Sequence, residues 1–279
     1  MKRIIIISLT VFCLAFIISC GNKSSNNKVI TINAGPQPQT IDPSINTSLD
    51  SCYYVIHAFE GLTTKDKDGN IVGGVAESWE ELDEGIRYIF HLRTNAKWSD
   101  GKPVLAEDFV YSWRRVVDPL VGSQYSFQHE SVKNAKDITA GKLPLESLGI
   151  KAIDDYTLEV ILEAPTAYFL DLTAFPTFYP IRKDIIEQYG NTWSLNPETY
   201  IGNGPFVATE INQDESIIMV KNTNYYDKDY IVAEKINILI MDDSNTALAA
   251  MKNGDLQFSV IEAPMGEIPS LMKENYILY

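Results

Sequence analysis

The sequence predicts a mixed α/β fold of the α+β kind, and two strands and one helix carry that prediction. Residues 86–93 alternate, and one side of this strand is purely apolar: Ile86, Tyr88, Phe90 and Leu92. Residues 156–162 repeat the alternation with Tyr156, Leu158, Val160 and Leu162. Residues 106–117 instead carry an apolar stripe at helical spacing: Phe109, Trp113, Val116 and Val117. Strands and helices do not alternate strictly along the chain, which indicates a mixed architecture.

The first elements follow from local patterns. The β-branched residues 29–34 predict a short strand, and residues 35–38 should be extended because each Pro disfavours helix at the residue before it. A helix is expected over residues 49–60, where four apolar side chains recur at helical spacing: Leu49, Tyr53, Ile56 and Phe59. Residues 66–70 predict a turn between short strands.

The predicted helix 106–117 has clear ends. Glu107 and Asp108 in its first turn suit the helix dipole, and Asp118-Pro119 stops it. Leu105 stands where a Ser or Thr cap would help, so we expect a helix start weaker by about 1 kcal/mol.

The other expected elements are irregular or short. They are the turns 98–103 and 202–206, a break at 164–167 with a short helix ending at Leu172, a rigid aromatic crossing at 175–180, strands 217–221 and 236–241, and helix 246–252 closed by Gly254. Large apolar residues at strand or helix positions should be core: Trp79, Phe90, Trp98 and Trp113. Three glycines should serve backbone geometry: Gly61, Gly101 and Gly204.

The N-terminus predicts export. Lys2 and Arg3 precede an apolar run of 15 residues, Ile4–Ile18, and the small residue Ser19 precedes Cys20. This arrangement is typical of a signal peptide, and the apolar run is short for a membrane span. Ile17-Ile18-Ser19-Cys20 resembles the lipobox of bacterial lipoproteins, in which Cys20 would become the lipidated first residue. The alternative is an ordinary signal peptide with a coincidental cysteine.

Composition excludes several classes of function. The net charge is -14, and it becomes -16 once Lys2 and Arg3 are removed, so nucleic acid and a broad membrane-binding face are disfavoured. Cys13 lies in the predicted signal peptide and Cys20 is the predicted lipid site, so Cys52 is the one free thiol left, and we expect it to be a small core residue. The three histidines show no metal-ligand spacing, and neither a metal site nor a cofactor is predicted.

No catalytic motif is present, and the chain is not expected to be an enzyme. The sequence has no nucleophile elbow, phosphate loop, dinucleotide fingerprint or zinc-protease motif. Paired carboxylates at Glu80-Glu81 and Asp154-Asp155 are typical of solvated faces. Gly202-Asn203-Gly204 could hold an anion with its backbone, but a lone glycine pair is weak evidence for such a site.

A series of longer motifs is far more specific. In order along the chain they are Phe59-Glu60-Gly61-Leu62, Gly74-Val75-Ala76-Glu77-Ser78-Trp79, Phe90-His91-Leu92-Arg93, Lys97-Trp98-Ser99-Asp100-Gly101, Asp108-Phe109-Val110-Tyr111-Ser112-Trp113, residues 151–160 and Gly202-Asn203-Gly204-Pro205-Phe206. From about residue 29 to the last residue, the chain resembles the oligopeptide-binding branch of the extracellular solute-binding proteins, family 5, of ABC importers.

The resemblance implies a fold, a function and partners. The fold would be like that of type II periplasmic binding proteins, with ligand held between two lobes. The protein would capture oligopeptides outside the cytoplasm, while anchored to a membrane, and deliver them to a permease driven by a separate ATPase. The implied organisation is a lipoprotein signal peptide (1–19), a lipidated Cys20 with a tether (20–28), an incomplete lobe one (29–59 plus 170–279) and an inserted subdomain (60–169).

The resemblance also implies ligand-contacting residues. The first-lobe contact segment of the family matches Pro36 to Gln39, so Gln37, Pro38 and Gln39 are candidates, and Tyr125 matches a cleft-facing tyrosine. Many peptide binders carry an acidic residue where Gln37 stands, so the contact to a ligand amino terminus would lack charge here. Val260 and Ile261 stand where relatives often carry polar residues, which implies either a more apolar pocket or a shifted alignment.

Length is the main departure, because family members are roughly twice as long. We therefore expect a missing second lobe, an uncovered apolar sheet face or edge, and weak or absent peptide binding by these residues alone. Other ligands of the same fold stay open: nickel complexes, haem or oligosaccharides. A surface adhesin or sensor that uses the scaffold without transport, and an extracytoplasmic hydrolase, are the remaining alternatives.

Overall fold

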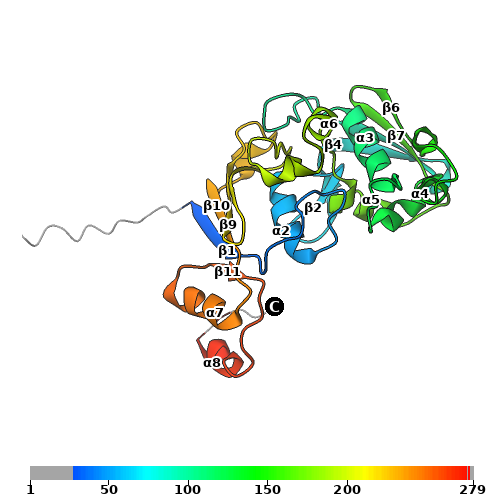
Figure 1. The fold of residues 1–279 in the computed structure, drawn as a ribbon. Coiled ribbons are helices and arrows are strands. Elements are labelled where there is room, and N and C mark those ends of the chain that lie inside the picture. Colours follow the sequence, from blue (N-terminus) through cyan, green and yellow to red (C-terminus); the bar gives the residue numbers. More distant parts are fainter. Residues whose placement is uncertain (1–27, 275, 277–279) are drawn as a thin grey trace, which may run out of the picture.

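The computed structural model describes residues 28–274 and 276, so the predicted signal peptide 1–19 and Cys20 lie outside the described residues. Two sheets and a hairpin organise this part of the chain. In the view of Figure 1, helix α2 (Leu49–Ala58) lies between the strands β1, β9 and β10 and the group that contains α3, β6 and β7. Helices α7 and α8 lie beyond β11 in the same view.

The larger sheet has the strand order β11-β1-β10-β9-β8. Its strands are β1 (Val29–Asn33), β8 (Phe206–Asn212), β9 (Ser216–Lys221), β10 (Lys235–Leu239) and β11 (Phe258–Ser259). The strand β1 is parallel to both neighbours, with Asn33 opposite Leu239 on β10 and opposite Ser259 on β11. The other pairs are antiparallel. The predicted strands at 29–34, 217–221 and 236–241 are confirmed, whereas β8 continues from residues that we predicted only as a turn.

The smaller sheet has the order β4-β5-β7-β6 and is antiparallel throughout. It contains β4 (Ala76–Leu82), β5 (Arg87–Leu92), β6 (Ile150–Asp154) and β7 (Thr157–Ile161). The alternation predicted for residues 86–93 is confirmed, because Tyr88, Phe90 and Leu92 are buried on one side of β5. A separate hairpin joins β2 (Thr63–Lys65) to β3 (Ile71–Gly73) around the predicted turn.

The helix α3 (Ala106–Val117) has the predicted bounds, and its predicted apolar stripe is fully buried. No side chain caps the helix at Leu105, as expected, but the Asp108 carboxylate accepts a hydrogen bond from the Leu105 N–H at 2.9 Å. That contact is one half of a capping box, and it offsets part of the missing cap.

The helix α2 begins at Ser48, whose hydroxyl accepts from the Asp50 N–H, and ends two residues earlier than predicted because Phe59 is extended. The helix α7 (Ser244–Asn253) ends at Gly254 in the left-handed conformation, as predicted. The other helices are α4 (Ala135–Thr139), α5 (Phe169–Leu172), α6 (Lys183–Tyr189) and α8 (Ile268–Lys273), with 3-10 turns at 83–85, 126–131, 145–147, 176–178, 190–195 and 228–230.

One cluster of buried side chains runs through both sheets and the helices between them, with Phe59, Phe90, Trp98, Trp113 and Trp193 among its largest members. Trp79 is only half-buried, because it lies on β4 at the edge of its sheet, and it packs against this cluster from outside. Cys52 is also half-buried, and its thiol lies 3.5 Å from Asn46 Nδ2. The division into lobe one and an inserted subdomain stays a prediction.

Candidate functional site

The carboxyl ends of three parallel strands meet at one edge of the larger sheet. The strands β1, β10 and β11 all run toward this edge, where the chain continues into residues 34–39, 240–243 and 260–263. The chain leaves β1 toward α2 on one side, whereas α7 connects β10 to β11 across β1. In sheets of this kind, loops that diverge beyond the carboxyl ends of parallel strands form the usual place for a ligand.

Asn33 joins these three loops. The fully buried Asn33 side chain accepts hydrogen bonds from the N–H groups of Gly35 and Met241, both at 3.1 Å, and donates to Ser259 Oγ at 3.1 Å. Its backbone carbonyl accepts from the Val260 N–H at 3.0 Å. One residue therefore fixes the starting positions of all three loops.

Gly35 lies at the centre of the site. Its φ of +89° is a conformation that L side chains rarely adopt, so a glycine is required. A Cβ here would lie 3.4 Å from Asp50 Oδ1, 3.4 Å from Val260 Cγ2 and 3.6 Å from Ile261 Cδ1. Asp50, Val260 and Ile261 therefore surround one point beside Gly35, and they combine a carboxylate with two apolar groups.

The predicted contact segment follows Gly35 directly. Gln37 and Gln39 are exposed, and Pro38 is buried. Gln37 Oε1 accepts a hydrogen bond from the backbone N–H of Asp214, at 2.8 Å, in the turn between β8 and β9. The amide carbonyl of Gln37 is thus engaged within the protein, whereas Nε2 makes one long hydrogen bond, 3.4 Å to the Pro38 carbonyl, and keeps a second N–H for a ligand.

Tyr125 is half-buried and lies in a different segment. Its ring packs against Phe127 and Phe175, with centroids 5.6 and 6.1 Å away. Two residues earlier, the Ser123 hydroxyl donates to the Ser44 carbonyl at 2.7 Å, which ties this segment to the chain between β1 and α2. Among the described residues, no hydrogen bond joins Tyr125 to residues 37–39.

The glycine pair at 202–204 has a packing role. A Cβ at Gly202 would lie 1.9 Å from the Ala58 carbonyl oxygen, and a Cβ at Gly204 would lie 2.6 Å from the Phe59 nitrogen. Asn203 accepts from the Glu60 N–H and donates to the Glu60 carbonyl. These contacts hold the end of α2 against the segment before β8, so the backbone here does not form the anion loop that we considered.

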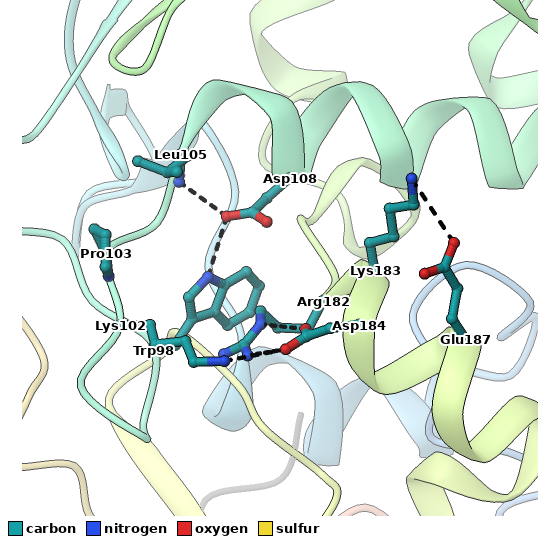
Figure 2. A pocket seen from close by; sticks show the side chains of 9 residues that line it. All are labelled: Trp98, Lys102, Pro103, Leu105, Asp108, Arg182, Lys183, Asp184 and Glu187. Carbon is teal, nitrogen blue, oxygen red and sulfur yellow. Dashed lines mark hydrogen bonds and ion pairs between the residues drawn. The ribbon is translucent and has the colours of Figure 1, made fainter.

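A hollow of about 350 Å³ between α6 and the segment that leads into α3 is lined mainly by groups that satisfy one another (Figure 2). Arg182 pairs with Asp100 and Asp184, and Lys183 pairs with Glu187. The Asp108 carboxylate accepts from Trp98 Nε1 at 3.1 Å, and burial raises the pKa of Asp108 to about 6. This arrangement stabilises the chain locally and leaves little unsatisfied charge for a ligand.

Sequence reasoning missed two residues of the site. Neither Asn33 nor Asp50 was predicted. Asn33 stands two residues before Gly35, where the chain turns, and at this spacing Asn side chains commonly bind the backbone. The position of Asp50 beside Val260 joins segments about 210 residues apart in the sequence, which no local pattern predicts.

Within residues 28–274 and 276, no group of three His, Cys, Asp or Glu side chains is placed to hold a metal ion. In that same part of the chain, no helix combines the length and apolar character needed to cross a bilayer.

Known proteins resemble this chain in sequence. The family model described as bacterial extracellular solute-binding proteins, family 5 Middle, matches residues 70–278. Oligopeptide-binding protein OppA of Bacillus subtilis is 36% identical over 252 residues, covering 90% of this chain and 46% of OppA. The probable deoxycholate-binding periplasmic protein YgiS of Escherichia coli is 38% identical over 248 residues, covering 88% of this chain and 46% of YgiS.

Solved structures agree. OppA of Burkholderia pseudomallei superposes with a TM-score of 0.85 at 36% identity, covering 88% of this chain and 48% of that one. Listeria monocytogenes OppA bound to peptide superposes with a TM-score of 0.80 at 38% identity, covering 83% of this chain and 46% of that one. The chain is a member of the bacterial extracellular solute-binding proteins, family 5, and its fold matches about half of each of these solved structures. It spans about half the length of the relatives it matches.

Proposed function

We propose that this chain belongs to the substrate-binding component of an ABC importer that captures oligopeptides outside the cytoplasm. A membrane permease and its ATPase are the proposed partners, and no reaction is assigned to the chain. The observation that carries the proposal is the position of the segment 35–39, held by Asn33 at the carboxyl ends of three parallel strands. Similarity to OppA bound to peptide supports it.

The chemistry of this segment suits a peptide backbone. Pro36 and Pro38 have no N–H, and the carbonyls of Pro36 and Gln37 accept no hydrogen bond from any described residue. These two carbonyls are available acceptors, which suits a ligand that presents N–H groups in an extended conformation, as an added strand does. Gln37, Pro38 and Gln39 would contact the peptide backbone, and Tyr125 would contribute an aromatic wall from the inserted subdomain.

Asp50 extends the proposed site. The carboxylate is half-buried and makes no ion pair with any described residue, and its described side-chain contact is with Ser48 Oγ at 3.3 Å. Beside Val260 and Ile261, it would favour a ligand with a cationic group next to an apolar one.

A titration followed by NMR tests the proposal and detects weak binding. Tripeptides added to the isotope-labelled chain should shift the backbone amides of Gly35, Gln39 and Val260, while amides at the β6–β7 turn stay in place. If no amide near Gly35 moves at millimolar peptide, this segment does not bind peptide.

Val260 and Ile261 favour a second candidate ligand, an amphipathic solute with a large apolar face, because they place two aliphatic side chains at the centre of the site. The similarity to a probable deoxycholate-binding protein supports the same reading. Deoxycholate and tripeptides can be compared on Val260→Asn. This variant should lose deoxycholate shifts and keep peptide shifts if both ligands bind through the proposed contacts. Loss of both would assign Val260 a purely structural role.

We also propose that Cys20 carries the lipid anchor after removal of residues 1–19, and that residues 20–28 form the tether. The proposal rests on the sequence alone. Metabolic labelling with palmitate should label the chain, and Cys20→Ser should abolish the label. Labelling of the Cys20→Ser variant would exclude this site.

We also propose a division into lobe one, 29–59 plus 170–279, and an inserted subdomain, 60–169. The larger sheet takes its strands from the first set of residues and the smaller sheet from the second, which supports the division. Hydrogen exchange should then protect the two sheets with different free energies of opening. One common value for both would contradict the division.

A further inference from the structure

A second hollow, of about 380 Å³, lies on the smaller sheet and α3, away from the strand ends of the larger sheet. Three cationic side chains line it: Arg114 from α3, Lys133, and Lys151 from β6. None of them makes an ion pair within the part of the chain that the structure describes, although Lys and Arg side chains elsewhere in the chain commonly do. In a chain with a net charge of -14, the convergence of three such cations is unusual.

Arg114 is the informative member. Its Nε is buried and has no hydrogen-bond partner among the described residues. A buried donor that lacks an acceptor is costly, and such a group calls for an explanation in a bound ion or water. By contrast, the neighbouring Arg115 is fully paired with Asp42. Arg114 also lines the hollow, so an acceptor bound there would lie close to this side chain.

The walls of the hollow are held by backbone contacts. Lys133 N–H donates to the Ile161 carbonyl and Lys133 O accepts from Gly149, both at 2.9 Å. A Cβ at Gly149 would lie 2.5 Å from the Ile161 oxygen and 2.7 Å from Lys133 Cβ, so glycine permits this close approach. Asn134 Nδ2 donates to the Ser147 carbonyl at 2.6 Å. Lys133 is therefore positioned by fixed backbone.

The lining also contains two carboxylates, Glu146 and Glu159. Glu159 pairs with Arg87 at 3.6 Å, and Glu146 is exposed. Both reduce the positive potential without reversing it, because three cations face two carboxylates. A ligand with one or two negative charges and several acceptor oxygens fits this balance, and a guanidinium beside ammonium groups is the usual set of side chains for phosphate.

We propose that Arg114, Lys133 and Lys151 form a binding site for a phosphate group, separate from the proposed peptide site. The group could belong to a free phosphate or phosphate ester, or to a phospholipid headgroup. Both sources present the same tetrahedral oxygens to the three cations, and the experiment separates them.

The test uses the full-length chain, isotope-labelled for NMR, at constant ionic strength. Inorganic phosphate and glycerophosphoglycerol, the soluble headgroup of phosphatidylglycerol, are added separately, with chloride as the control. Saturable shifts of the Gly149 and Lys151 amides with phosphate alone assign a free phosphate or ester. Shifts with the headgroup at lower concentration assign a lipid. Equal, non-saturable shifts with chloride overturn the proposal.

Variants separate the site from general charge effects. Arg114→Gln should weaken binding by about 10-fold, and Lys151→Gln by about 3-fold because its side chain is exposed. Lys142→Gln is the matched control, since Lys142 lies nearby in the sequence but pairs with Asp137. Unchanged binding in both Arg114→Gln and Lys151→Gln would exclude the site. Lys151→Gln keeps the test valid if Arg114→Gln does not fold.

Discussion

Arg115 on α3 donates two hydrogen bonds, at 3.1 and 2.8 Å, to the carboxylate of Asp42 in the segment between β1 and α2. Both side chains are buried, and Trp193 Nε1 donates to the same carboxylate at 3.0 Å. The pair joins the segment that follows the candidate site to the helix that packs on the smaller sheet. Each charge depends on the other, because a buried charge without a partner is strongly unfavourable.

Asp42→Ala should therefore lower the free energy of unfolding by about 3 to 5 kcal/mol, because it leaves Arg115 buried without a counterion. Urea denaturation measures the change. Asp137→Ala, which breaks the exposed pair with Lys142, is the matched control and should cost at most about 1 kcal/mol. Similar losses in the two variants would show that burial of the Asp42–Arg115 pair is not decisive.

Asn33→Ala should lower the free energy of unfolding by about 2 to 4 kcal/mol, because the N–H groups of Gly35 and Met241 lose their acceptor in a buried position. At low pH, where its carboxyl group is protonated and adds no buried charge, Asn33→Asp keeps both an acceptor and a donor toward Ser259, so there it should cost less. Thermal unfolding compares them. An aspartate variant as unstable as the alanine variant would contradict the role of the Asn33 carbonyl.

Glu60 should make the chain less stable as the pH rises. Burial raises the pKa of Glu60 from 4.5 to about 7, although Tyr225 donates to its carboxylate at 2.7 Å. Between these two values the folded state holds a proton that the unfolded state has released, so the free energy of unfolding falls with pH and levels off above 7. The free energy of unfolding of Glu60→Gln, relative to that of the wild type, should therefore rise by about 2 to 3 kcal/mol between pH 5 and pH 8. A constant difference between the two proteins over this range would refute the effect.

His129 should act in the opposite direction. It stacks on Phe178 with centroids 3.9 Å apart, and burial lowers its pKa from 6.5 to about 3. The unfolded state therefore takes up a proton first, and stability that is complete above pH 6.5 is lost as the pH falls toward 3. Between pH 7 and pH 5, His129 should lower the free energy of unfolding of the wild type by about 2 kcal/mol, and His129→Phe should not show this decrease. The exposed His91→Asn is the control, and equal acid sensitivity in wild type and His129→Phe would exclude His129 as the cause.

Gln37→Glu should raise the affinity for peptides with a free amino terminus by about 2- to 5-fold over N-acetylated ones, because it adds a charge at an exposed position. Glutamate also keeps an acceptor for the Asp214 N–H. Fluorescence titration with matched free and acetylated peptides measures the ratio. An unchanged ratio would place the peptide amine away from Gln37.

Elements with strong periodicity could be predicted from the sequence. Helix α3 has its predicted bounds because its stripe and the Asp118-Pro119 stop agree, and Gly254 ends α7 because glycine adopts the left-handed conformation without strain. The strand β8 was missed because its start coincides with Gly204-Pro205, which reads as a turn. Helix α6 was missed as well, since it has neither a side-chain cap nor a fully buried residue.

The candidate site could be predicted only in part. The segment 37–39 was located through the family resemblance, and its role as a ligand contact stays a prediction. The surroundings of Gly35 could not be predicted, since Asp50, Val260 and Ile261 meet there through the pairing of β11 with β1. The hydrogen bond from the Asp214 N–H to Gln37 could not be predicted either, because it depends on where the β8–β9 turn lies in space.

The contacts of Asn33 bear on how strongly the site can bind. Loops that become ordered only in a complex reduce affinity by the conformational entropy they lose. Here the residues on both sides of Gly35 are held before any ligand arrives, by one buried amide and the strand ends around it. This half of the site is preorganised, so little of the interaction energy with a ligand is lost to ordering these loops.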